Sequence, residues 1–495
     1  AFDELFILQL RAEMIRQSLK RQTAPSIDFK EKAIKDFVSS LSFVLTNSQK
    51  MAAWEIIKDM KKNEPMNRLL QGDVGSGKTV VAAICAYDAI LNGYQVILMA
   101  PTEILASQHY ESFVNLFKNN EVKIGLYTRT KKILPLVGGV RGGSVLLTRT
   151  PPNLPYEGRK SKFQIPNIIV GTHALLSENV EFKNLGLVIV DEQQRFGVEQ
   201  RRTIREKSGN KNIMPHFLSM TATPIPRSFA LTVYGDLDMS IIRGLPPGRK
   251  PIKTRLVADF NRGKAYEFIR GQVKNGRQIF VICPLIDNTP CLPVGRESVV
   301  SLAQADKKSV LSEYEKLSKQ VFPDLKIGYL HGKLKSQEKD EVIKKFADKD
   351  LDILISTSVI EVGVNFPNAS VMMIEGADKF GLAQLHQFRG RVGRSIYQSY
   401  CFLFTDSQSQ KSTERLNFFE KNNDGFKLAE FDLSKRGPGE VYGTEQSGIL
   451  KFKFASMSDV EIIKTARELA GGLDFTKYSF LKDKVKEWEN NMHLE

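Results

Sequence analysis

Residues 72–79 read Gly-Asp-Val-Gly-Ser-Gly-Lys-Thr, and this stretch decides the fold. Its spacing fits G-x-x-x-x-G-K-[ST], in which a glycine-rich loop turns backbone N–H groups toward phosphate oxygens. Leu69–Gln71 before it are typical of the end of a buried strand, and Val80–Leu91 after it are typical of an apolar helix. Strand, loop and helix together predict a phosphate-binding loop, with Lys78 on the β- and γ-phosphates and the Thr79 hydroxyl on Mg²⁺.

An acidic pair, Asp191-Glu192, ends the apolar run Leu187–Val190 farther along the chain. Asp191 at a strand end is suited to hold Mg²⁺ through water, and Glu192 to orient or deprotonate an attacking water. Together with the loop, the pair predicts binding and hydrolysis of a nucleoside triphosphate. The loop alone is equally compatible with a GTPase, a small-molecule kinase, a transporter ATPase or a nucleic-acid motor.

Length and composition exclude several protein classes. A chain of 495 residues can hold two to four domains with sizeable cores. It has no run of 18 apolar residues, and its start lacks the basic and apolar regions of a secretory signal. Since the first residue is not Met, we expect the chain to begin partway through a longer protein. The cysteines lack metal-ligand spacing and indicate reduced thiols in a cytosol; they are Cys85, Cys283, Cys291 and Cys401.

The chain is strongly basic. Its 71 Lys and Arg against 56 Asp and Glu give a formal net charge of +15, and the pI is about 9.4. This balance favours a polyanionic partner such as nucleic acid. On charge alone, a basic protein without such a partner stays an alternative.

Short apolar runs alternate with helix-like stretches from residue 43 to about 240, and the alternation restarts after the linker-like stretch Pro246–Pro251. This pattern predicts parallel sheets covered by helices in two tandem α/β domains, only the first with a phosphate loop. Such an organisation is typical of a motor with its nucleotide between two domains. The expected strands are Gln95–Met99, Lys123–Leu126, Ile168–Val170, Leu187–Val190, Phe217–Met220, Gln278–Cys283, Lys326–Leu330, Asp352–Ser356, Ser370–Ile374 and Ser399–Phe404.

Two segments, 131–164 and 288–308, interrupt the alternation. The first holds nine Gly and Pro and seven Lys and Arg against one Glu, without a sustained period. Both segments are predicted to be inserted surface loops. A nucleic-acid-binding arm is the alternative interpretation of the first.

Two further motifs favour the motor class. Ser219–Pro224 follows a predicted strand, and the hydroxyls of its Thr221 and Thr223 are suited to couple the γ-phosphate site to movement. In the second half, Gln387–Arg394 contains Arg391 and Arg394, three residues apart, and we expect them on one helical face. Planar, permanently charged guanidinium groups suit the charge that develops on a transferring phosphoryl group.

In this order the motifs resemble those of superfamily 2 helicases, and specifically the RecG family. Phe43–Gln49 resembles the adenine-reading segment of that family, which implies that Gln49 contacts the base. Ala100–Ala106 and Gly171–Leu175 resemble motifs that contact DNA. Ser356–Val364 resembles motif V of the family, and Gln387–Arg394 resembles motif VI.

The stretch from Asp424 to Gly448 is similar to the translocation motif that RecG shares with the transcription-repair coupling translocase. In that family it forms a helical hairpin and a loop that convert domain closure into movement along duplex DNA. The ending Gly443-Thr444-Glu445-Gln446-Ser447-Gly448 fits RecG better. The resemblance covers the chain from residue 1 to about 470, apart from 131–164 and 288–308.

The resemblance implies an α/β fold with two tandem RecA-like domains, each with a parallel sheet, and a small helical C-terminal translocation hairpin. We expect a helical linker at 1–42, the domains at 43–245 and 246–410, and the hairpin with C-terminal helices at 411–495. The implied catalytic residues are Lys78, Asp191, Glu192, Arg391 and Arg394, with Thr79 and Asp191 on Mg²⁺. The implied ATP-binding residues are Phe43, Gln49, Gly72, Gly75, Gly77, Lys78, Thr79 and Gln387. The implied DNA-contact and coupling residues are Thr102, Thr172, His173, Thr221, Thr223, Thr357, Arg436 and Gln446.

By the same resemblance the chain is an ATP- and Mg²⁺-dependent translocase on double-stranded and branched DNA, such as stalled forks and Holliday junctions, in recombination and repair. We expect a monomer in the bacterial cytoplasm at the nucleoid, without membrane attachment, and single-stranded DNA-binding protein is a candidate partner. The coupling translocase class, and a truncated fragment that binds DNA without remodelling it, are the alternatives.

Several features depart from the family pattern. RecG proteins carry an N-terminal wedge domain, and no segment of this sequence resembles it. Gln194 stands where the family usually has His, and Asn365 where it usually has Asp. Thr128-Arg129-Thr130 stands where the family reads Thr-Gly-Ser at a DNA contact.

Overall fold

The protein is described here by a computed structural model, which covers residues 1–135, 144–147, 166–177, 182–192, 203–204, 207, 213–223, 237–244, 246, 248–284, 310–357, 366, 368–393, 397–436, 455, 459–475, 477–478 and 480–492. The chain divides into two compact units, residues 1–247 with 433–495 and residues 248–432. The first break lies within Pro246–Pro251. Within these described ranges, no helix is both long and apolar enough to cross a membrane.

The first unit is built on a sheet with the strand order β5-β4-β3-β6-β2-β7-β8-β1-β9. The pairs from β3–β6 to β1–β9 are parallel, and β3–β4 and β4–β5 are antiparallel. The strands are β1 (Asn67–Gly72), β2 (Gln95–Met99), β3 (Ile124–Tyr127), β4 (Lys132–Pro135), β5 (Ser144–Leu147), β6 (Ile168–Gly171), β7 (Leu185–Asp191), β8 (His216–Thr221) and β9 (Asp238–Ile242).

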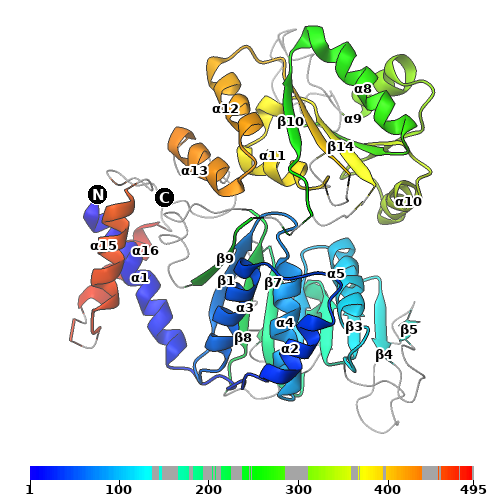
Figure 1. Ribbon diagram of the computed structural model, residues 1–495. Coiled ribbons are helices and arrows are strands. Elements are labelled where there is room, and N and C mark those ends of the chain that lie inside the picture. The colour runs from blue at the N-terminus through cyan, green and yellow to red at the C-terminus, as the bar shows by residue number, and fades with distance from the viewer. Residues whose placement is uncertain are drawn as a thin grey trace, which may run out of the picture. The chain divides into compact units, whose positions relative to one another are not determined.

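Helices α3, α4 and α5 lie side by side over one face of this sheet (Figure 1). The strands beneath them are buried on both faces, as β2 is at every position, which explains their continuous apolar sequences. The helices of this part are α2 (Glu31–Ser39), α3 (Asn47–Met60), α4 (Lys78–Leu91), α5 (Glu103–Leu116) and the 3₁₀ turn η1 (His173–Leu176).

The second unit contains a parallel sheet with the order β10-β15-β14-β11-β13-β12. Its strands are β10 (Lys253–Val257), β11 (Gln278–Ile282), β12 (Ile327–Leu330), β13 (Ile353–Ser356), β14 (Ala369–Ile374) and β15 (Tyr400–Phe404). Its helices are η3 (Asp259–Asn261), α8 (Arg262–Lys274), α9 (Val310–Lys316), the π-helical turn η5 (Leu317–Val321), α10 (Ser336–Ala347), η7 (Ala377–Lys379), α11 (Leu382–Arg389) and α12 (Gln410–Lys421).

The predicted fold class, two tandem α/β domains with parallel sheets, is confirmed. Each expected strand is present within two residues of its predicted ends. The prediction of a loop for 131–164 is wrong for β4 and β5, because these strands extend the sheet from the edge of β3. The sequence missed them because an antiparallel pair of four-residue strands is too short to show a period. The predicted loop 288–308 lies outside the described residues.

The C-terminal segment 411–495, expected as one module, is divided between the two units. The boundary at residue 432 falls inside α13 (Gly425–Arg436). In the first unit, α15 (Val460–Gly471) and α16 (Phe480–Met492) pack against α1 (Phe2–Lys20) (Figure 1). Leu10, Ala470, Phe475 and Val485 form the apolar core of this helical cluster. Within the predicted helical linker at 1–42, α1 therefore packs apolar side chains against the C-terminal helices.

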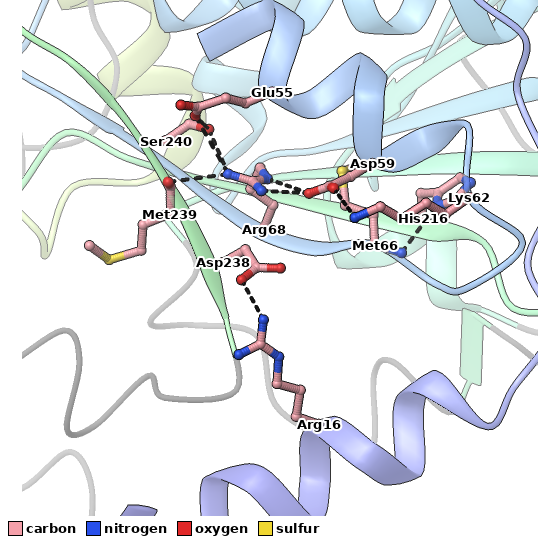
Figure 2. Close-up of polar contacts among 10 residues, drawn as sticks. All are labelled: Arg16, Glu55, Asp59, Lys62, Met66, Arg68, His216, Asp238, Met239 and Ser240. Carbon is pink, nitrogen blue, oxygen red and sulfur yellow. Dashed lines mark hydrogen bonds and ion pairs between the residues drawn. The ribbon is translucent and has the colours of Figure 1, made fainter. Parts of the chain in front are cut away.

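A polar network crosses the strands β1 and β9 (Figure 2). The Arg68 guanidinium in β1 donates to Asp59 Oδ2 of α3 at 3.0 Å and to Met239 O and Ser240 Oγ of β9 at 3.2 and 3.0 Å. Burial alone would raise the pKa of Asp59, but hydrogen bonds from Lys62 and Arg68 hold it below its usual range. The network ties β9, the edge strand beside the phosphate loop, to β1 and α3.

The segment between α1 and α2 is tied to the same end of the sheet through His216, which also contacts Met66 (Figure 2). His216 in β8 is fully buried, its Nδ1 accepts from the Met66 N–H at 3.0 Å, and its Nε2 lies 2.7 Å from Pro25 O. Because Nδ1 accepts, Nε2 carries the proton and donates to the Pro25 carbonyl. An ion pair of 2.8 Å joins Arg16 of α1 to Asp238 of β9. Helix α1 and the segment that follows it are therefore each attached to the sheet at one point.

Candidate functional site

The predicted phosphate loop connects β1 to α4. Gly75 and Gly77 have φ values of 77° and 92°, a left-handed conformation that glycine adopts without strain. A Cβ at Gly77 would lie 2.1 Å from the Gln49 amide nitrogen, so Gly77 also permits a close approach. The Lys78 ammonium donates to the carbonyls of Gly72 and Asp73 at 2.6 and 3.0 Å. The loop thus curls around the lysine, and the N-terminus of α4 faces the same side.

Gln49 holds the loop from α3. Its Nε2 donates to Ser76 O at 2.7 Å, and its Oε1 accepts from the Thr46 N–H at 2.8 Å, closing a capping box at the start of α3. The amide expected to contact a base therefore bonds to the loop and the helix start. Its assignment to the base stays a prediction.

A cavity of about 890 Å³ lies beside the loop in the first unit. Gln49, Gly77 and Thr79 line it together with Phe43 and the exposed Val44. Phe43 is 47% exposed, so its ring is accessible as a face for a planar group. The structure thus brings Phe43, Gln49 and the start of α4 together around one space.

Asp191 ends β7, two strands from β1 in the same sheet. Its Oδ2 lies 2.8 Å from Nε2 of His109, a buried residue of α5. Burial alone would raise the pKa of Asp191, but the hydrogen bond and charge of His109 and the charge of Lys78 outweigh it and hold the pKa below its usual range. The carboxylate is therefore ionised beside the phosphate loop.

Glu192 follows in the left-handed conformation, with a φ of 55° that is uncommon for a residue with a side chain. Its N–H donates to Met220 O at 2.9 Å, which holds this backbone against β8. Thr221 Oγ1 donates to Glu192 Oε2 at 3.3 Å, and the two hydroxyls of Thr221 and Thr223 are 2.7 Å apart. The strained turn aims the carboxylate at the motif that was predicted to couple hydrolysis to movement.

These residues fit a nucleoside triphosphate with Mg²⁺. The buried Ser76 hydroxyl has no hydrogen-bond partner within the described part of the chain, and it lies in the loop expected to face phosphates. Thr79 and Asp191 offer the hydroxyl and carboxylate oxygens that Mg²⁺ prefers. The bound metal would neutralise charge on the phosphates.

A second hollow of about 630 Å³ in the first unit gathers the predicted DNA contacts. Thr102 begins α5 and accepts from Leu105 N at 3.3 Å, and Thr172 begins η1 and accepts from Ala174 N at 3.4 Å. His173, Arg129 and Lys132 share the lining. Two helix starts, two cations and the Glu103 carboxylate therefore line one space, and the helix starts and cations are suited to an anion.

In the second unit, α11 carries the half-buried Gln387 and ends at Arg389. The expectation of Arg391 and Arg394 on one helical face is wrong, because Gly390 caps the helix and Gly393 has a φ of 76°. Arg391 therefore lies in the turn after the helix and is buried. Thr357, after β13, is also buried.

Arg389, to which the sequence assigned no role, is almost fully buried. Its Nη1 donates to the carbonyls of Phe419 and Asn422 at 3.1 and 3.0 Å, and its Nη2 lies 2.9 Å from His386 Nδ1. The guanidinium also stacks over the Phe419 ring at 4.1 Å. It thereby fixes the end of α12 against α11, immediately before the helix α13.

Burial raises the pKa of Asp432 in α13 to about 6, although its carboxyl accepts from the Leu382 backbone at the start of α11.

Some predicted positions lie outside the described residues: Arg394, Gln446, Gln194, Asn365 and the side chain of Arg436. His109 was missed altogether. Its place in the sequence gives only helical periodicity, and no local signal connects it to Asp191.

Comparison with known proteins identifies each part of the chain. The DEAD/DEAH box helicase family model matches residues 47–231, and the helicase conserved C-terminal domain matches 264–396. The model of the ATP-dependent DNA helicase RecG, domain 3, C-terminal matches 422–482.

Curated relatives cover almost the whole chain. ATP-dependent DNA helicase RecG of Thermotoga maritima is 44% identical over 472 residues, which are 94% of this chain and 56% of the relative. RecG of Staphylococcus epidermidis is 42% identical over 496 residues, 98% of this chain and 67% of the relative. The chain thus spans about half to two thirds of the length of these relatives.

A solved structure of RecG bound to a three-way DNA junction superposes with a TM-score of 0.73 at 40% identity, over 95% of this chain and 56% of that one. The helicase MrfA bound to DNA has a TM-score of 0.52 at 18% identity over 82% of this chain and 55% of that one, and it shares the fold. The phosphate loop, the acidic pair, the C-terminal helical segment and these relatives lead to one conclusion: the chain belongs to the RecG family of ATP-dependent DNA helicases.

Proposed function

We propose that this chain is an ATP-driven translocase on double-stranded DNA that remodels branched DNA in recombination and repair. The observation that carries the proposal is the geometry at Glu192. Its carboxylate lies next to the ionised Asp191 beside the phosphate loop and accepts a hydrogen bond from Thr221. A base for hydrolysis and a motif suited to transmit movement are thus in direct contact.

The proposed roles follow from the chemistry of each group. Lys78 and the N–H groups of the loop bind phosphate oxygens, and Thr79 and Asp191 hold Mg²⁺. Glu192 takes the proton of the attacking water. Arg391 and Arg394 stabilise charge on the transferring phosphoryl group. Phe43 and Gln49 recognise the base in the cavity beside them.

DNA binding is assigned to the hollow around Thr102, Thr172 and His173. Helix starts contact phosphates without reading bases, which suits a translocase that moves along any sequence. The RecG relative of known structure is bound to a three-way junction, and this supports branched DNA as the substrate. We extend the proposal to a monomer at the bacterial nucleoid, with single-stranded DNA-binding protein as a candidate partner.

A DNA-stimulated ATPase assay tests the proposal. We expect turnover to rise with a three-way junction and with linear duplex, and Lys78→Ala to abolish it with both. Absence of stimulation by any DNA would reject the motor and leave the alternative of a fragment that binds DNA without remodelling it.

Movement is tested separately by displacement of a triplex-forming strand from duplex DNA. Arg436 and Gln446 are proposed to couple domain closure to stepping. Arg436→Ala or Gln446→Ala should keep most of the DNA-stimulated ATPase while abolishing displacement. A stable, ATPase-active variant that displaces the third strand at the normal rate would refute the coupling role.

A further inference from the structure

His109 makes a hydrogen bond to Asp191 and has no role in the hydrolysis proposed above. The residue lies in α5, its side chain is buried, and its Nε2 is 2.8 Å from Asp191 Oδ2. A buried carboxylate is usually bonded by a backbone N–H or by Arg or Lys. Here an imidazole is a further donor, and it comes from α5, the helix between β2 and β3.

The same helix also reaches the hollow assigned to DNA, which Thr102 and Glu103 help to line. Thr102 is the residue that caps its first turn, and the Glu103 carboxylate accepts from the Thr130 N–H at 3.1 Å and from the Thr130 hydroxyl. His109 lies two turns further along. Because α5 is an unbroken helix over Glu103–Leu116, its first turn and His109 belong to one continuous element.

We propose that His109 is a positioning residue that orients the Asp191 carboxylate for Mg²⁺, and that α5 links this carboxylate to the DNA-contact hollow. The inference rests on the proposed ATPase function. The N–H of His109 holds the Asp191 carboxylate through Oδ2, and the carboxylate so fixed would be oriented for Mg²⁺ or its water. Hydrogen-bond partners of ligating carboxylates typically contribute 10–100-fold to metal affinity.

The alternative is that His109 has only a structural role, as a core histidine that supplies a hydrogen bond to a buried carboxylate. If so, a substitution that leaves the protein folded should not change its affinity for the metal. A positioning role also requires a donor at the place of Nε2. A Gln side chain can place its amide nitrogen near the position of Nε2, whereas Asn is one methylene too short and reaches only the position of Nδ1.

The test measures Mn²⁺ binding to the full chain with a non-hydrolysable ATP analogue, from the electron paramagnetic resonance of free Mn²⁺. Mn²⁺ binds the same oxygen ligands as Mg²⁺. His109→Ala and His109→Asn should weaken Mn²⁺ binding about 10–100-fold, and His109→Gln should restore most of it. Affinity for the analogue without metal, and for duplex DNA without nucleotide and metal, should stay unchanged. Gln108→Ala, one position earlier on a different face of α5, is the matched control and should behave as wild type.

Equal Mn²⁺ affinity in wild type and in a folded His109→Ala variant would overturn the inference, as would equal losses in the Asn and Gln variants. If His109→Ala fails to fold, the comparison of His109→Gln with His109→Asn decides. Failure of the wild-type chain to bind the nucleotide analogue at all would instead reject the proposed ATPase function.

Discussion

Acidification should remove a stabilising contribution that His216 makes to the first unit. Burial lowers the pKa of this imidazole from its ordinary value of 6.5 to about 4, although the Pro25 carbonyl and Asp59 oppose the shift. The unfolded chain therefore binds a proton below pH 6.5 that the folded chain refuses until about pH 4. The contribution of His216 to stability is fully present above pH 6.5 and is lost as the pH falls between these values.

The magnitude follows from the difference between the two pKa values. Each unit of pKa corresponds to about 1.4 kcal/mol. The free energy of unfolding should fall by about 2 kcal/mol at pH 5 and about 3 kcal/mol at pH 4 through this residue alone. Asp88 acts in the opposite direction, since burial raises its pKa to about 6 and the folded state gains a proton in the same interval. The total pH dependence is therefore a sum, and a variant is needed to isolate His216.

His216→Asn removes the titrating ring and keeps an acceptor for the Met66 N–H. Urea unfolding of wild type and variant, followed by tryptophan fluorescence, reports on the first unit because Trp54 and Trp488 both belong to it. The difference between the two unfolding free energies should shrink by about 3 kcal/mol from pH 7.5 to pH 4. Ser26→Ala, which removes the bond from Ser26 Oγ to Lys61 O without a titrating group, is the control and should give a constant difference. A constant difference for His216→Asn as well would refute the buried, neutral imidazole.

Three further predictions concern catalysis and the second unit. Glu192→Gln should abolish ATP turnover and keep nucleotide binding, measured by equilibrium titration, because the amide retains the shape and loses the basicity. Arg394→Lys should lower turnover about 10³–10⁵-fold with little change in ATP affinity, and a parallel loss of affinity would show a ground-state contact instead. Arg389→Ala should destabilise the second unit by about 3 kcal/mol or more, because it leaves the buried carbonyls of Phe419 and Asn422 without donors. Hydrogen exchange at the end of α12 measures this last effect, and unchanged protection there would contradict it.

The confirmed predictions concern structure that is set by residues close to one another in the sequence. The loop at residues 72–79 needs only a strand before it, glycines within it and a helix after it, all of which are local. The alternation of apolar strands with helices indicated parallel sheets, because crossover helices bury both faces of such strands. The prediction for Arg391 was wrong, because α11 ends at Arg389 and Arg391 lies in the turn after it.

The short strands β4 and β5 could not be predicted from sequence periodicity. Four-residue strands in a segment rich in glycine and proline carry too few positions for a period of two, and they form because the edge of β3 offers unpaired N–H and C=O groups.

By itself, the sequence determined the nucleotide-binding loop, the acidic pair, the two α/β domains and the family, because these features consist of short motifs and of periodic burial. Only the tertiary structure decided which side chains support them. His109 and Asp191 are 82 residues apart and meet because β2 and β7 are neighbours in the sheet, and that strand order is set by the packing of the whole domain. Arg389 likewise finds its carbonyl partners, Phe419 and Asn422, 30 and 33 residues away, at the end of a helix that only the folded unit brings to it.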